Sequence, residues 1–298
     1  MSQFIEGEPL GIIAEVKRGI AVTLALGPKA IKFALLPALL YLATVLIFEL
    51  NTQGLDPGLQ QIVNSPVLFA VTLLGDVYYT IYLFRYFLVE SHETSQNSAI
   101  LRFGPEERQF FKWTLYMFMI MAPLGVVFFI IYIHFENGLV ICGELVGLKF
   151  TIIENARANP LALPADMTFE YLKSIDEFDP YKLGDWVLSS YRVLSFASFF
   201  AFIGARYAFL FTAAVAGTKT SVSSAKKLLG AQFRPLFLIT IGYVCIVMTG
   251  YSIMDAQFDK QSLWYILIAC AWHLFGLLLA VFDAYITTRY YQRALDAQ

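Results

Sequence analysis

The sequence predicts an all-α, polytopic integral membrane protein with six transmembrane helices. Three observations carry this prediction: an apolar composition, a series of long apolar runs, and an Arg-Tyr pair that recurs at the ends of such runs. Of the 298 residues, 58% are hydrophobic and 15% are charged, and the mean hydropathy is +0.63. Soluble domains contain about 45–50% apolar and about 25% charged residues. The composition therefore indicates a membrane protein.

Six apolar runs are long enough to cross a bilayer, whose hydrocarbon core takes about 20 helical residues. These runs are apolar at nearly every position, whereas strands of a membrane barrel alternate between apolar and polar residues. Helices are therefore expected. The predicted spans are residues 28–50, 66–89, 110–134, 187–216, 233–254 and 262–288.

Lysine and arginine are distributed unequally between the two sets of connections. The connection between the first two spans has neither, and the connection between the last two has only Lys260. Because basic residues stay in cytoplasmic loops, both termini are predicted to be cytoplasmic, and residues 135–186 are predicted to form an extracytoplasmic loop. The basic residues on the predicted cytoplasmic side are Lys17, Arg18, Lys29, Lys32, Arg102, Arg108, Lys112, Lys219, Lys226, Lys227 and Arg234.

An internal repeat is predicted from two recurring patterns. Arg-Tyr pairs begin at Arg85, Arg206 and Arg289, and a Ser-Ala-x-x-x-apolar-Gly pattern covers residues 98–104 and 224–230. Each basic, amphipathic segment that leads into a span fits a helix lying on the membrane surface. The pattern predicts three tandem helical hairpins with interfacial amphipathic helices in one membrane domain, residues 1–298, in which residues 1–27 form the first interfacial helix. The alternative is that basic and aromatic residues are simply common at this membrane border.

The extracytoplasmic loop is predicted to have two parts. LVICGELVGLKFTII is apolar enough to extend a helix or to lie at the membrane interface. NPLALPADMTFEYLKSIDEF indicates a Pro-containing turn followed by a short helix that Asp166 or Thr168 could cap. This loop is expected to act as a lid or a docking surface rather than as a catalytic domain.

The segment RYAFLFTAAVAGTKTSVSSAKKLLGAQFRPLFLITIGY joins an Arg-aromatic span end, a small-residue turn and a Ser-Ala-Lys amphipathic helix. In this it resembles bacterial six-span proteins similar to the membrane domain attached to some glycerophosphoryl diester phosphodiesterases. The hydrolase of that family is a separate barrel, which needs about 250 residues that this chain does not have. The resemblance implies a membrane domain of a bacterial inner membrane and no catalytic residue.

Two polar residues lie near the middle of predicted spans. A carboxylate at this depth, here Asp76, normally faces the protein interior and has a partner. His273 lies at similar depth, so His273 or a tyrosine is expected to contact Asp76. The pair could form a proton-relay or substrate site, or it could be a structural latch between helices. Asp283 lies closer to the cytoplasmic border and is a third intramembrane candidate.

The arginines Arg85, Arg206 and Arg289 are predicted either to anchor the inner border or to bind lipid phosphates there. On the predicted fourth span, small residues recur every four positions and permit close helix approach, either as an internal packing face or as a dimer interface. These residues are Ala197, Ala201 and Ala205.

No enzymatic activity, cofactor or metal site is expected. The chain has no GxSxG, HExxH, P-loop or dinucleotide motif, and its three histidines are scattered. The net charge of −2 gives no case for nucleic-acid binding.

The sequence favours a non-enzymatic inner-membrane scaffold, assembly factor or accessory subunit of a larger membrane complex. Its expected partners are membrane lipids and other membrane proteins. The alternative is a transporter or lipid-handling protein with an intramembrane polar site at Asp76 and His273.

Overall fold

The computed structural model describes residues 11–51, 66–88, 104–158, 180–218, 220–257 and 263–297. Within these ranges every element is a helix and no strand occurs, which confirms the all-α prediction. The elements, in chain order, are α2 (Ile12–Phe33), α3 (Leu35–Asn51), α5 (Pro66–Leu88), α6 (Pro105–Ala158), α8 (Pro180–Val215), α9 (Val222–Leu229), η3 (Gly230–Gln232), α10 (Phe233–Gln257) and α11 (Leu263–Asp296).

Four described segments are long and apolar enough to cross a membrane, namely Pro105–Phe135, Ser190–Val215, Val222–Gly250 and Leu267–Asp296. If α2 and α3 together form one broken span, the number of candidate membrane-spanning segments among the described residues rises to five. The chain is thus compatible with a multi-pass membrane protein. The predicted second span, residues 66–89, coincides with α5 but is not among these segments. Six spans arranged as three hairpins therefore stay a prediction.

The predicted first span, residues 28–50, does not match a single helix. α2 continues past Pro28 to Phe33, and α3 then leaves at an angle of 87°. Pro37 explains this position, because a proline ring clashes with the carbonyl four residues earlier, here that of Phe33. α2 therefore extends six residues beyond the predicted end of the interfacial helix at residue 27, and the interfacial location of this helix stays a prediction.

The connection predicted for residues 135–186 is partly helical. α6 has 54 residues and continues to Ala158, and α8 already begins at Pro180. The expected helix extension is therefore present. The Pro-containing turn and the short helix capped by Asp166 or Thr168 lie outside the described residues, as does the first interfacial pattern up to residue 103. The second pattern forms α9, followed by Gly230.

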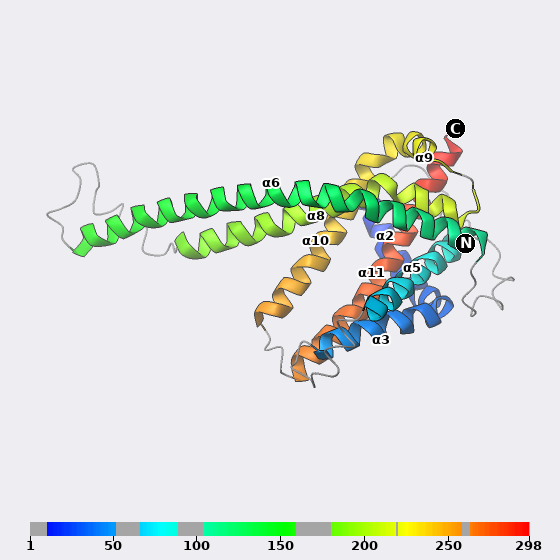
Figure 1. The fold of residues 1–298 in the computed structure, drawn as a ribbon, viewed down its shortest axis with the longest axis horizontal. Coiled ribbons are helices and arrows are strands. Elements are labelled where there is room, and N and C mark those ends of the chain that lie inside the picture. The colour runs from blue at the N-terminus through cyan, green and yellow to red at the C-terminus, as the bar shows by residue number, and fades with distance from the viewer. Residues whose placement is uncertain are drawn as a thin grey trace. The chain divides into compact units, whose positions relative to one another are not determined.

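The chain divides into two compact units, residues Met1–Phe118 with Phe200–Gln298 and residues Met119–Phe199. In the first unit, α11 contacts α2, α3, α5, α9 and α10 (Figure 1). Its core consists mainly of aromatic and small residues, including Tyr79, Phe209, Ala213 and Tyr285. The single membrane domain expected over residues 1–298 stays a prediction.

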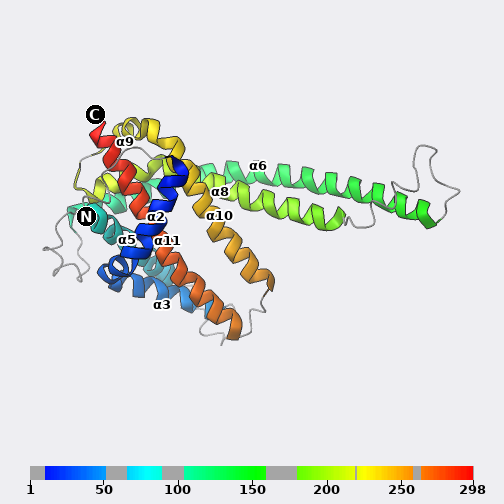
Figure 2. The same cartoon turned by 180° about the vertical axis from the view of Figure 1, so that it is seen from behind.

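The second unit is a helical hairpin made by the later part of α6 and the first part of α8, which lie side by side in both views (Figure 2). Stacked aromatic rings hold the two helices together. The ring centroids of Phe128 and Phe199 lie 4.4 Å apart, and those of Tyr132 and Tyr191 lie 5.5 Å apart with nearly parallel planes. Tyr191 also donates a hydrogen bond to the carbonyl of Tyr132, at 3.4 Å.

Gly75 sets the close approach of α5 to α3. A Cβ atom at this position would lie 3.0 Å from the backbone nitrogen of Tyr41, and backbone cannot move aside as a flexible side chain can. Gly75→Ala is therefore expected to lower the thermal stability of the purified protein by about 1–3 kcal/mol through overpacking.

Gly242→Ala on α10 is the matched control, because a Cβ atom there meets nothing within 4 Å. This change is expected to be neutral or stabilising by up to about 1 kcal/mol, since alanine favours helices over glycine. Equal melting temperatures for the two variants in the same detergent would contradict the close packing of α3 on α5.

Candidate functional site

A buried ion-pair cluster joins the start of α2 to the end of α11. The Nε atom of Arg289 donates to the Oε2 atom of Glu15 at 2.9 Å, and both side chains are fully buried. The Nη2 atom of Arg293 lies 2.6 Å from the Oε1 atom of the same carboxylate. One glutamate therefore pairs with two arginines that lie on one face of α11, four residues apart.

The local sequence explains why these groups meet. Glu15 lies in the first turn of α2, and Arg293 lies in the last turn of α11, which are the helix ends that favour a negative and a positive charge, respectively. One turn beyond Glu15, Gly19 has no side chain, and a Cβ atom there would collide with the ring of Phe282. The glycine thus lets α2 approach α11 closely enough for the carboxylate to reach Arg289.

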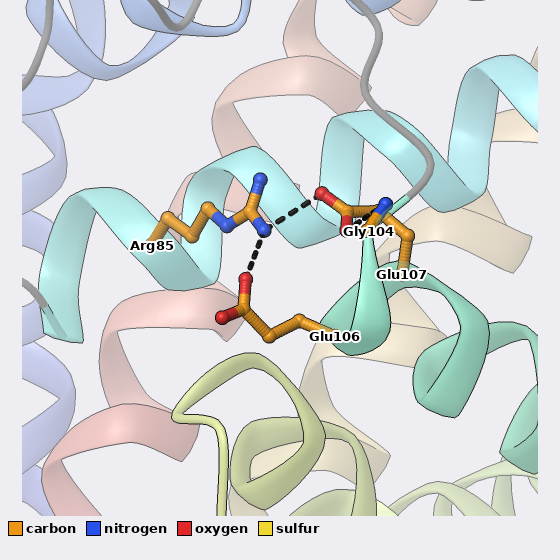
Figure 3. A network of polar contacts seen from close by, with 4 residues as sticks. All are labelled: Arg85, Gly104, Glu106 and Glu107. Carbon is orange, nitrogen blue, oxygen red and sulfur yellow. Dashed lines mark hydrogen bonds and ion pairs between the residues drawn. The ribbon is translucent and has the colours of Figure 1, made fainter.

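A second cluster joins the end of α5 to the start of α6 (Figure 3). The Nη2 atom of Arg85 lies 2.5 Å from Oε2 of Glu106 and 2.7 Å from Oε1 of Glu107. The other oxygen of Glu107 accepts a hydrogen bond from the backbone N–H of Gly104, at 2.9 Å. The Glu107 side chain is 2% exposed, whereas that of Glu106 is 43% exposed. Glu107 is therefore the buried partner of Arg85, and Glu106 is the solvated one.

The third arginine of the Arg-Tyr pattern also contacts the start of a helix. The guanidinium carbon of Arg206 lies 5.9 Å from the ring centroid of Phe233, the first residue of α10. Each of the three arginines thus meets a first turn, with a carboxylate on α2 and α6 and an aromatic ring on α10. In the described residues, protein carboxylates engage Arg85 and Arg289, and phosphate binding at these two arginines stays a prediction. For Arg206, phosphate binding stays a prediction.

The intramembrane acids lie near tyrosines. Asp76 is within electrostatic range of Tyr41 on α3, Tyr79 on α5 and Tyr243 on α10. Asp283 is also within range of Tyr243. The hydroxyl of Tyr79 donates to the carbonyl of Leu277 on α11, at 3.0 Å. The structure therefore brings both acids towards one group of phenol side chains.

His273 is buried on α11, one helical turn before Leu277. Its pairing with Asp76 stays a prediction. Asp76 itself keeps an exposed surface on α5, while its neighbours Gly75 and Val77 are buried.

The remaining predicted residues are located as follows. Ala197, Ala201 and Ala205 are all at most 1% exposed on α8, which places them in the protein interior. Within the described ranges, no group of three or more His, Cys, Asp or Glu side chains could hold a metal ion.

Sequence reasoning missed the acids Glu15, Glu106 and Glu107. A signal was available, because an arginine buried at a helix end needs a carboxylate and all three acids lie in first turns at the same predicted membrane border. What the sequence does not reveal is which arginine meets which acid, since Glu15 and Arg289 are 274 positions apart.

Comparisons with protein-family models, curated proteins and solved structures found no match for this chain. The resemblance to membrane domains attached to phosphodiesterases therefore stays a prediction, and the function has to be argued from the residues themselves.

The two glutamates that contact Arg85 provide a matched pair for mutation. Glu107→Gln is expected to cost about 3–5 kcal/mol of stability, because it removes a buried partner of a charge and disturbs the hydrogen bond to Gly104. Glu106→Gln is expected to cost at most about 1 kcal/mol, since exposed ion pairs contribute little. Thermal unfolding of the two variants in the same detergent measures the difference, and a larger loss for Glu106→Gln would contradict the assignment.

Proposed function

We propose that this protein is a non-enzymatic membrane scaffold or accessory subunit that binds other membrane proteins through the hairpin of α6 and α8. The proposal rests on the exposure of α6 in this hairpin, because α8 covers only a narrow stripe of it. Between residues 124 and 135, only Gly125, Phe128 and Tyr132 are not exposed, and Phe128 and Tyr132 are the residues that contact α8. The outward-facing side chains are large and apolar, including Val126, Val127, Phe129, Ile130, Ile131 and Phe135.

A helical hairpin with one covered stripe leaves most of its apolar surface to lipid or to another protein. In a bilayer there is no hydrophobic gain from pairing helices, so association depends on close packing of side chains and on polar contacts. Phenylalanine and isoleucine side chains supply broad faces for such packing. The proposal is that a partner helix occupies part of this surface and that lipid covers the rest.

The length of α6 favours a docking role as well. Its 54 residues extend about 81 Å at 1.5 Å per residue, whereas the hydrocarbon core is about 30 Å thick. If residues 105–135 cross the membrane, the remaining part of α6 continues for about 35 Å. A helix of this length beyond the bilayer offers an additional surface to a partner complex.

The ion-pair clusters also favour a static role. Glu15, Glu107 and Arg289 are buried and used to join helices, so these charges are committed to holding the first unit together. A protein whose border charges are fixed in this way suits the role of a scaffold.

The second candidate is a transporter or lipid-handling protein, and the group of Asp76, Asp283 and Tyr243 favours it. Two carboxylates near phenols at membrane depth are costly unless they are paired or hydrated, and such groups often mark a path for protons or ions. The exposed surface of Asp76 needs either water or a partner helix. The transporter proposal assigns it water.

Site-specific photo-cross-linking in native membranes tests the scaffold proposal. A photoreactive residue in place of Ile130, which is 63% exposed, is expected to give a protein adduct of defined mass. The same residue in place of Tyr132, which is 7% exposed and lies against α8, is the control and is expected to give no intermolecular adduct. Adducts with lipid alone at Ile130 would contradict the proposal.

Asp76→Asn separates the two candidates. Under the scaffold proposal, the purified protein in liposomes shows no proton flux with a pH-sensitive dye, and the variant keeps its melting temperature because an amide still forms hydrogen bonds. Proton flux by the unmodified protein that disappears in Asp76→Asn would contradict the scaffold proposal and support the transporter.

A further inference from the structure

A pocket of about 560 Å³ lies between the first turns of α6 and the loop that leads into α9. Two of its lining residues are cations, Arg108 and Lys112, which are four residues apart and therefore lie on one face of α6. Among the described residues, no carboxylate lines it. The described lining residues are Arg108, Gln109, Lys112, Trp113, Thr220 and Ser221.

Hydrogen bonds within the loop between α8 and α9 position Thr220 and Ser221, which supply the hydroxyl groups of the pocket. α8 ends in a Schellman motif, in which Gly217 has a positive φ of 71° and the N–H of Thr218 donates to the carbonyl of Ala213 at 3.0 Å. The carbonyl of Thr218 accepts a hydrogen bond from Gln109 at 3.4 Å, which ties this loop to α6. Ser221 then caps α9 through a reciprocal bond with Ser224.

At the start of α6, the acidic side chains contact α5, and the basic side chains line the pocket. Glu106 and Glu107, which precede Arg108, contact Arg85 on α5. The ammonium group of Lys112, which lines the pocket, lies 5.6 Å from the ring centroid of Trp113. The pocket therefore combines two cations, two hydroxyls and an indole.

The location of this pocket identifies the kind of ligand. The excess of Lys and Arg assigns these connections to the cytoplasmic side, where anionic lipids create a negative surface potential. Tryptophan is enriched at the headgroup level. Arginine, lysine and hydroxyl donors are suited to phosphate oxygens. We propose that this pocket binds the phosphate group of an anionic phospholipid from the adjoining leaflet.

This inference deepens the proposed function, because it names a lipid that a membrane scaffold would hold. The lipid test reports on the first unit, and cross-linking at Ile130 reports on the second unit, so the failure of one is distinguishable from the failure of the other. The probe is phosphatidylglycerol added to delipidated protein in a neutral detergent, with bound lipid counted by native mass spectrometry and stability followed by thermal unfolding.

Phosphatidylglycerol is expected to bind and to raise the melting temperature, because a ligand that binds only the folded state stabilises it. Arg108→Gln with Lys112→Gln is expected to weaken binding about 25-fold, about fivefold for each cation removed. Lys226→Gln with Lys227→Gln is the charge-matched control, since both lysines are exposed on α9 and neither lines the pocket. This control is expected to change binding less than twofold, roughly the error of the titration.

Ser221 gives a second test that preserves the fold. Aspartate and asparagine are both good N-caps, so Ser221→Asp and Ser221→Asn should each keep α9. Only Ser221→Asp adds a negative charge to the pocket, and it is expected to weaken phosphatidylglycerol binding about fivefold while Ser221→Asn leaves it unchanged.

Two results would overturn the proposal. One is equal phosphatidylglycerol binding by the unmodified protein, the Arg108/Lys112 double variant and Ser221→Asp. The other is stabilisation by inorganic phosphate or glycerol 3-phosphate as large as that by the lipid, which would identify a soluble phosphate compound as the ligand. Phosphatidylcholine, which carries a phosphate but no net charge, is expected to bind more weakly than phosphatidylglycerol.

Discussion

Arginines that are buried or partly buried against the first turns of other helices impose the constraint on which the first unit depends. A guanidinium group cannot lose its proton, so an arginine withdrawn from water needs a carboxylate or an aromatic ring close by. The chain meets this need with residues in the first turns of other helices: Glu15 for Arg289, Glu107 for Arg85 and Phe233 for Arg206. Through these contacts α11 is joined to α2, α5 to α6, and α8 to α10.

This constraint also shapes the surface at the same border. The first-turn acids of α6 contact Arg85, and the cations that follow them line the pocket beside α9. Internal pairing and lipid recognition are therefore linked by the geometry of one helix. Side chains at Glu107 and Arg108 are adjacent in sequence but point about 100° apart around the axis, since an α-helix has 3.6 residues per turn. One short stretch of sequence can thus serve two different contacts.

Composition and hydropathy were sufficient to predict an all-helical, multi-pass protein, but they did not locate every boundary. They predicted a span from residue 28, whereas Pro37 breaks the chain near Ala34 and α2 extends to Phe33. They placed residues 135–158 in a connection and gave two alternatives for its apolar part, a helix extension or an interfacial segment, and the helix continues to Ala158. Hydropathy reports depth in a membrane and says little about where a helix ends once it leaves the bilayer.

The site was harder to predict than the fold for a related reason. A hydropathy profile gives the depth of a residue but not the direction in which it faces around its helix. It therefore placed Asp76 and His273 at one depth, but it did not reveal that tyrosines from α3, α5 and α10 lie within electrostatic range of Asp76. The same limit applied to the arginines, whose pattern was visible while their glutamate partners, far away in sequence, were not.

The most direct test of this account is an electron cryomicroscopy structure of the protein in lipid nanodiscs that contain phosphatidylglycerol. The account predicts continuous density between Arg289 and Glu15, and headgroup density beside Arg108 and Lys112. Phosphate density at Arg85 or Arg289, with Glu15 and Glu107 turned away from these arginines, would contradict it.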